Sequence, residues 1–220
     1  METSGPTTAG AAHPERGEAL LEWIRQHRQL VSWGSAIVVI AAGLFAWKLL
    51  STRQSERMAS QQLNAARFAL DSKNFALAAS ELSRIAENYS GTRSASEASV
   101  LLAQVRLAQG QSQQAIEVLK DFAPGAGAAY RGQAYGLLGA AYENLAHPKE
   151  AGEAFEEAAR NTRMPFLRAG FLSDAGRAWL SAGDTARARR AYEEIVTKHD
   201  STASAYEAKA RLGEISKGLP

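Results

Sequence analysis

The sequence predicts an all-α protein, in which one N-terminal transmembrane helix precedes an α-solenoid of about four helix pairs and a C-terminal capping helix. Three observations support this fold class. An uncharged apolar run of eighteen residues lies near the N-terminus. The next proline after that run is Pro124, so helix can continue beyond it. One arrangement of small and large side chains then occurs four times.

Length and composition limit the classes of protein that are possible. The chain has 220 residues, of which 45% are hydrophobic and 22% charged, and this fits one ordinary domain plus an additional segment. With 25 Lys and Arg against 23 Asp and Glu, the net charge of +2 is too small to predict a nucleic-acid partner. The absence of cysteine excludes disulfides and thiolate metal sites.

The additional segment is the run LVSWGSAIVVIAAGLFAW, residues 30–47. At ~1.5 Å per residue it spans roughly 27 Å, close to the ~30 Å hydrocarbon core of a bilayer. Trp33 and Trp47 lie toward its ends, where indole rings favour the boundary between water and lipid. We therefore predict a transmembrane helix, with a buried core helix as the alternative. A cleaved signal peptide would have a shorter apolar region of ~7–15 residues and a small-residue cleavage site.

The segments around this run complete the N-terminal part. We expect a disordered head over residues 1–17, a juxtamembrane segment and transmembrane helix over 18–50, and a helical link over 51–58. A flexible tether is the alternative for the link. Lys and Arg are nearly equal in number on the two sides of the run, so charge does not predict the membrane orientation.

The repeats are aligned on one alanine per copy, and the intervals between these alanines are 36 or 37 residues. The four residues are Ala78, Ala115, Ala151 and Ala188. Twelve residues earlier stand small residues: Ala66, Ala103, Gly139 and Gly176. Four residues later stand large residues: Leu82, Leu119, Phe155 and Tyr192. We expect a repeat domain over 59–220, with copies near 59–95, 96–131, 132–168 and 169–205 and a cap over 204–217.

This layout resembles the tetratricopeptide repeat, whose pattern is W-x2-L-G-x2-Y, then A-x3-F, then P. The third and fourth copies match best, and Tyr142 and Trp179 occupy the position of the tyrosine. In the first two copies Ala69 and Arg106 replace that tyrosine, and no copy has the final proline. The resemblance implies antiparallel helix pairs in which small residues form notches that large residues fill. An unrelated helical bundle is the alternative.

The turns inside the predicted pairs fall at one point of the repeat, and Pro148 and Asp184 have turn-specific roles. Pro148 is expected at the first position of a helix, and Asp184 is expected to cap one. The short stretch SAYEAKARLGEISK, residues 204–217, is expected to be the solvating helix at the end of the stack.

No constellation of residues predicts catalysis, a metal site or a cofactor. The four histidines are far apart in the sequence and lack metal-ligand spacing. The stretch GAGAAYRG, residues 125–132, has no strand before it and no lysine and serine after it, so we expect a turn and not a phosphate loop. We expect a protein that is not an enzyme. A catalytic protein whose site has no recognised motif is the alternative.

The remaining function is binding by shape, on the face formed by the first helix of each pair. In tetratricopeptide repeats, positions two, five, nine and twelve of the unit point into the groove. Carried over, these positions include Leu63, Arg67, Leu70, Val100, Gln104, Leu107, Gly136, Ala140, Glu143, Ser173, Arg177 and Leu180. Leu63, Val100 and Leu107 either form an apolar strip beside Arg67 and Arg177, suited to a segment of another protein, or pack against neighbouring helices.

A single anchor, a short head and a tetratricopeptide domain of this length resemble the ancillary-subunit family of the bacterial Sec translocon. This resemblance implies a single-pass protein of the bacterial inner membrane with a periplasmic repeat domain. Its expected partners are translocon components, chaperones and exported chains, with homo-oligomers allowed and no nucleic acid bound. The alternative is a self-associating scaffold of the cell envelope that coordinates cell division or outer-membrane assembly.

Overall fold

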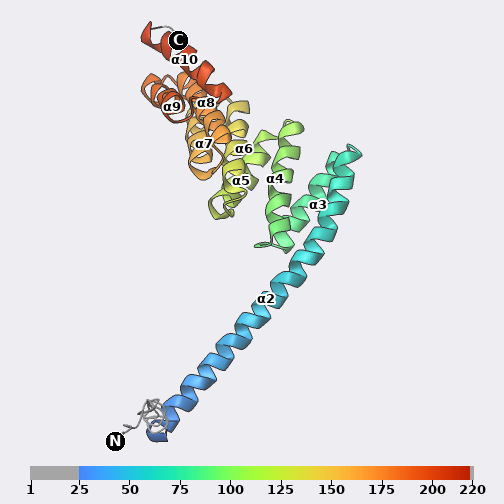
Figure 1. Ribbon diagram of the computed structural model, residues 1–220. Coiled ribbons are helices and arrows are strands. Elements are labelled where there is room, and N and C mark those ends of the chain that lie inside the picture. The colour runs from blue at the N-terminus through green and yellow to red at the C-terminus, as the bar shows by residue number, and fades with distance from the viewer. Residues whose placement is uncertain (1–24, 219–220) are drawn as a thin grey trace, which may run out of the picture. The chain divides into compact units, whose positions relative to one another are not determined.

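The computed structural model describes residues 25–218, which form helices joined by turns, with no strand among them (Figure 1). The helices are α2 (Arg28–Asp71), α3 (Phe75–Asn88), α4 (Arg93–Ala108), α5 (Ser112–Phe122), α6 (Arg131–Asn144), α7 (Pro148–Asn161), α8 (Pro165–Ser181), α9 (Thr185–Lys198) and α10 (Ala203–Ser216). A short 3-10 helix, η1 (Ala123–Gly125), follows α5. The all-α prediction is confirmed.

The chain divides into two compact units, Met1–Thr52 and Arg53–Pro220. The predicted head, 1–17, lies outside the described residues. The predicted link, 51–58, lies within α2, which continues to Asp71. Within α2, the stretch Ile37–Asp71 includes a segment that is long and apolar enough to cross a membrane, and no residue of that segment is buried.

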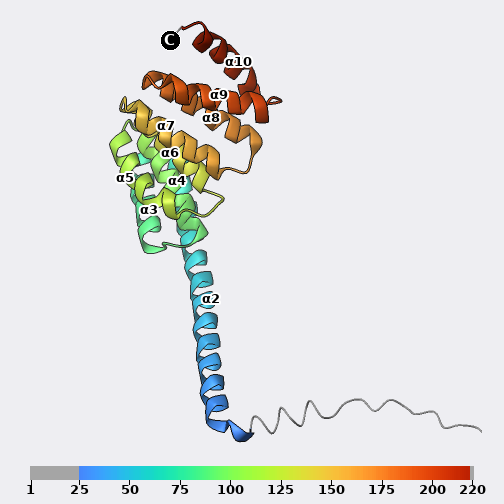
Figure 2. The same ribbon diagram turned by 90° about the vertical axis from the view of Figure 1, so that its left-hand side faces the viewer.

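The second unit is a stack of helix pairs (Figures 1 and 2). The C-terminal end of α2 pairs with α3, α4 with α5, α6 with α7, and α8 with α9, while α10 packs on α8 and α9. Three apolar clusters lie at successive junctions of the stack. The first joins α2, α3 and α4, the second joins α4 to α7, and the third joins α7 to α10. Each pair thus buries its apolar side only by contacting its neighbours, as expected of a solenoid.

Small residues within each pair allow close contact between its two helices. A Cβ added to Gly139 would lie 2.7 Å from the Phe155 ring, and one added to Gly176 would lie 2.5 Å from the Tyr192 ring. In the first two pairs the notch is an alanine and the large residue is a leucine, and all four of these side chains are completely buried. The four aligned alanines are completely buried as well: Ala78, Ala115, Ala151 and Ala188. The two alanine notches of the first two pairs are Ala66 and Ala103.

Two further glycine notches join successive pairs. A Cβ added to Gly152 on α7 would lie 2.6 Å from the ring of Trp179 on α8. A Cβ added to Gly136 on α6 would lie 2.5 Å from the ring of Phe171 on α8. The third and fourth pairs therefore interlock through aromatic rings that fill glycine notches.

The turn inside each pair contains one residue with positive φ. These residues are Lys73, Gly110, Ala146 and Gly183, with φ between 56° and 77°. In each turn the next residue donates its backbone N–H to a carbonyl five residues earlier, which closes the end of the first helix. Pro148 begins α7, and the Asp184 carboxylate accepts the Arg187 N–H at 2.9 Å. Both turn predictions are confirmed.

The first helices approach one another more closely than the second helices do. In the described part of the chain α4 contacts α6 and α8 contacts α10, whereas no two second helices make a comparable contact. Grooves of about 510 and 450 Å³ open between α5 and α7 and between α7 and α9, and one of about 580 Å³ opens between the first helices α6 and α8. We call the surface formed by the first helices, α2, α4, α6 and α8, the inner face, because first helices line the concave side of such repeat stacks, and we call the surface of α3, α5, α7 and α9 the outer face.

The Glu56 side chain on α2 caps the N-terminus of α4. Its carboxylate accepts the Arg93 N–H at 2.7 Å, the Ser94 N–H at 3.2 Å and the Ser94 hydroxyl at 2.6 Å. Burial alone would raise the pKa of Glu56, but the hydrogen bonds from Ser94 and Arg93 hold this pKa below its ordinary value. Free N–H groups at a helix start favour a carboxylate in this way, so Glu56 joins the first pair to the second.

We expect Glu56→Gln to lower the free energy of unfolding by about 1 kcal/mol at pH 7, the usual effect of losing a helix cap. Because the pKa of Glu56 is lowered in the folded state, its charge stabilises the fold above the unfolded pKa, and this contribution is lost as the pH falls through the folded pKa. Urea unfolding at pH 7 and pH 3 measures this, and the difference between the two proteins should shrink at pH 3. An equal difference at both pH values would contradict a role for the charge.

Candidate functional site on the inner face

The N-terminal half of the inner face carries one ion pair between neighbouring first helices. The Arg67 guanidinium on α2 contacts the Glu97 carboxylate on α4. Arg67 and Gln104 are exposed, and Leu70 and Leu107 are half-buried beside them. This half presents mixed polar and aliphatic groups, and its Arg67 is already paired.

The C-terminal half carries a larger polar network. Arg177 on α8 contacts Glu143 on α6 at 3.1 Å and Asp174 at 3.0 Å. The Ser173 hydroxyl on α8 donates to the Glu207 carboxylate on α10 at 3.0 Å. These contacts join the first helices of the third and fourth pairs, α6 and α8, to the capping helix α10.

The charges of this half are partly withdrawn from water. Burial is the largest influence on Asp174 and raises the pKa of that carboxyl, although Arg177 opposes the shift. Burial also raises the pKa of Tyr192 to about 12, opposed by the charge of Arg211. The Tyr192 hydroxyl is buried and, within the described part of the chain, has no hydrogen-bond partner. The inner face thus holds carboxylates and guanidinium groups that are partly withdrawn from water. Interactions between charges are stronger there than in bulk water.

The proposed apolar strip of the groove is wrong at two of its three residues. Leu63 and Val100 are each only 3% exposed. Leu63 packs in the cluster that joins α2, α3 and α4. The small residues around these positions bring the helices so close that the side chains enter the junction between pairs. The packing alternative therefore holds for both, while Leu107 remains half-buried at the surface.

Gly136 and Ser173 occupy the equivalent position in the third and fourth pairs, and they are buried too. Gly136 is the notch for Phe171, and Ser173 is 5% exposed. This position therefore faces a neighbouring helix in every pair. Arg67, Gln104 and Arg177, four residues further along each first helix, remain at the surface.

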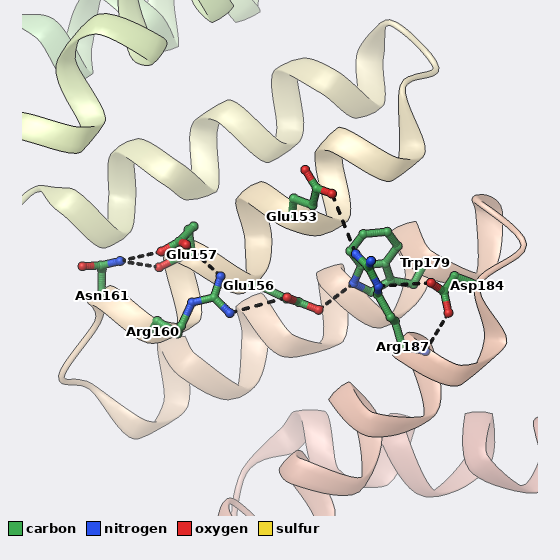
Figure 3. A network of polar contacts seen from close by, with 8 residues as sticks. All are labelled: Glu153, Glu156, Glu157, Arg160, Asn161, Trp179, Asp184 and Arg187. Carbon is green, nitrogen blue, oxygen red and sulfur yellow. Dashed lines mark hydrogen bonds and ion pairs between the residues drawn. The ribbon is translucent and has the colours of Figure 1, made fainter.

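The outer face has its own polar network, around Trp179 (Figure 3). The Trp179 Nε1–H donates to Glu156 at 2.8 Å, and the Arg187 guanidinium lies 4.3 Å from the centre of the ring. Arg187 also contacts Asp184 at 3.1 Å, and Arg160 contacts Glu156. Trp179 is 1% exposed, so this network covers a core residue and fixes α7, α8 and α9 together.

Sequence reasoning missed the acidic partners Glu97, Asp174 and Glu207. Contacts between first helices join residues 30 or 34 positions apart, as in the pairs Arg67 with Glu97 and Glu143 with Arg177. Opposite charges separated by nearly one repeat length, on the same side of successive first helices, were the signal that could have identified these pairs.

The side chains of the inner face are suited to binding. Among the described residues, no group of His, Asp and Glu is placed to hold a metal ion. The carboxylates of this face contact arginine or serine side chains. Ion pairs that can exchange one partner for a charged group of a ligand, beside half-buried aliphatic residues, suit the recognition of a polypeptide segment.

Comparison with known proteins agrees with this geometry. A family model described as a tetratricopeptide repeat-like domain matches residues 56–168, and a tetratricopeptide repeat model matches residues 172–202. No curated protein matches the sequence. Two crystal structures of a candidate kinesin light chain of Podosopora anserina, with nearly identical TPR-like repeats, are similar in fold. One of them, a form with a single substitution, has a TM-score of 0.52 at 20% identity over 74% of this chain and 91% of that one. The other has a TM-score of 0.53 at 20% identity over 74% and 92%.

Proposed function

This chain belongs to the tetratricopeptide repeat-like family, and on that premise we propose that it is a membrane-anchored adaptor that binds other proteins through its inner face. Repeats of this kind present a curved surface that binds protein partners. The observation that carries the proposal is the network of Glu143, Asp174 and Arg177, which lies at the surface beside half-buried aliphatic residues.

The inner face suits a polypeptide segment that carries both charged and apolar side chains. Arg177 is about half exposed in its side chain, at 47%, and can exchange one of its carboxylate partners for that of a ligand. Leu180 and Ala140 are half-buried and offer aliphatic contact on the same surface. A bound segment that contacts Arg177 and these aliphatic residues displaces water from a surface that is already partly buried.

The anchor is supported by the side chains of α2 in the first unit. Ile37, Val38, Val39, Ile40 and Leu44 are all more than 60% exposed. A run of exposed aliphatic residues in a helix of this length is stable in hydrocarbon and unfavourable in water. We therefore place this segment in a bilayer.

The resemblance to the ancillary Sec-translocon family supplies the more specific part of the proposal. In this form the protein resides in the bacterial inner membrane as a single-pass protein, with its repeats in the periplasm. The inner face then holds exported chains or chaperones beside the translocon.

Photocrosslinking in intact membranes tests this proposal. A photoreactive residue at Leu180 on the inner face should give adducts with translocon components, chaperones or exported chains. The same residue at Gln113, exposed on the outer face, is the control. Arg177→Glu should lower the adduct yield from Leu180 several-fold, because it places a like charge beside Glu143 and Asp174.

Arg160→Glu makes the same charge change on the outer face and should leave the yield unchanged. Equal adducts from Leu180 and Gln113 would contradict the inner face as the binding surface. Adducts that contain only a second copy of the chain would replace the adaptor with the self-associating scaffold.

A further inference from the structure

Each of α4, α6, α8 and α10 is covered by the helix that precedes it, and one position shows this clearly. Val105, Ala141, Ala178 and Ile215 occupy equivalent positions on α4, α6, α8 and α10, and they are 4%, 0%, 1% and 7% exposed. The equivalent residue on α2 is Phe68, which is 74% exposed. The large aromatic side chain of Phe68 is thus exposed at a position where the equivalent residue of each of the other four helices is buried.

The neighbours of Phe68 on α2 repeat this contrast. Met58 is 47% exposed, whereas its equivalent on α4, Ala95, is 3% exposed. Ala65 is exposed, whereas its equivalent, Leu102, is 4% exposed. We call the surface of Met58, Gln61, Ala65 and Phe68 the open face of α2. All four residues belong to the second unit.

The opposite end of the stack is adapted to water. Two core positions of α8 are Leu172 and Trp179, and the equivalent positions of α10 are Lys209 and Ser216. Both α10 residues are exposed. Repeat stacks need a polar outer surface on their terminal helices to stay soluble. Tyr206, the equivalent on α10 of the buried Ala169, is exposed as well, but it carries a hydroxyl. The exposed Met58 and Phe68 of the open face have no such polar group, which indicates that another helix covers the open face.

We propose that the open face pairs with the open face of a second copy of this chain, with the two α2 helices parallel. The residues of the open face are spaced by three, four and three positions, which is the spacing of a seam between two helices. No charged residue lies between Arg57 and Arg67, so parallel pairing brings no like charges together within the seam. Ala65 leaves room for close approach of the backbones.

The parallel arrangement rests on the membrane anchorage proposed above. Two anchors inserted in the same sense put the open faces of both copies on the same side of the bilayer, and confinement to one bilayer raises the local concentration of copies. A small contact then suffices for pairing. The pairing leaves Arg177 and Glu143 of the inner face free for a client, because they lie on α8 and α6.

Disulfide crosslinking of the full-length protein in membranes tests the pairing, because the native chain contains no cysteine. Symmetric residues in a parallel seam lie close enough for a disulfide, so Ala65→Cys should give a product of twice the mass under oxidation. Asn64→Cys, exposed on the neighbouring side of α2, is the matched control and should give at least tenfold less. Equal products from the two variants, or none from Ala65→Cys, would overturn the proposal.

Phe68→Asp adds a second readout. In the Ala65→Cys background it should reduce the crosslinked fraction at least tenfold, while the melting temperature of the stack changes little because Phe68 is exposed. An unchanged crosslinked fraction, or a crosslinked product that contains a different protein, would overturn the pairing of two copies. Carbonate extraction of the same membranes tests the anchor separately, so failure of the anchorage and failure of the pairing are distinguishable.

Discussion

Trp179→Ala is expected to lower the free energy of unfolding by about 3–5 kcal/mol, the usual cost of removing a large aromatic side chain from a core. The ring is 1% exposed and fills the notch at Gly152 on the preceding pair. Its Nε1–H donates to Glu156 at 2.8 Å, and Arg187 lies over its face. The substitution leaves a cavity at the junction of α7, α8 and α9, and removes the partner of a carboxylate. Denaturant unfolding followed by circular dichroism at 222 nm measures the loss.

Two variants control this measurement. Trp179→Phe keeps an aromatic ring in the notch and loses the hydrogen bond to Glu156, so its loss should be clearly smaller than that of the alanine variant. Tyr206→Ala removes a side chain that is 79% exposed, and its effect should stay within about 0.5 kcal/mol. A loss below about 1 kcal/mol for Trp179→Ala would show that the junction between the third and fourth pairs contributes little to stability.

The packing of the pairs could be predicted because it recurs. A small residue twelve positions before each aligned alanine, with a large residue four positions after it, allows one arrangement of two antiparallel helices. The contacts of Gly139 with Phe155 and of Gly176 with Tyr192 have this form. Trp179 was predicted as a packing residue, but its partner Gly152 was not, because contacts between pairs do not follow from the pattern within one pair.

The groove could be predicted only in part. The four residues Leu63, Val100, Gly136 and Ser173 differ in size and polarity, and all of them are buried. Burial at this position depends on how closely successive first helices approach, and that distance is set by alanine and glycine residues on several helices at once. A single position in a family pattern does not contain this information. Arg67 and Arg177 lie at the surface, but the sequence did not show that each already has a carboxylate partner.

The exposure of the open face of α2 could not be predicted from the sequence either, for a different reason. Phe68 belongs to the first copy of the repeat, and its equivalents in later helices include Val105 and Ala178. An apolar residue at this position is ordinary inside a stack and becomes unusual only at its end. In the second unit no helix precedes α2 and covers this surface. Phe68 is therefore exposed, whereas its equivalents on the later helices are buried.

Two charges in the apolar run should release the protein from the membrane. Ile40 lies near the middle of the predicted span, 30–47, Leu44 lies one helical turn further along it, and both are exposed on α2. An arginine near the centre of a membrane helix costs about 2.5–3.5 kcal/mol on insertion scales, so Ile40→Arg with Leu44→Arg should cost roughly 5–7 kcal/mol. This exceeds a thousandfold change in the insertion equilibrium. Fractionation followed by alkaline carbonate extraction measures the result: the native chain should stay with the membrane pellet and the double variant should not.

The control places the same two charges on the outer face of the stack. Gln113→Arg with Gln114→Arg alters two exposed residues of α5, and this variant should remain in the membrane pellet. Loss of both double variants from the pellet would indicate that added charge, and not its position, causes release. Extraction of the native chain by carbonate would show that α2 does not span the bilayer. The exposed aliphatic residues of the first unit would then need a protein partner to cover them, since a run of this length is unfavourable in water.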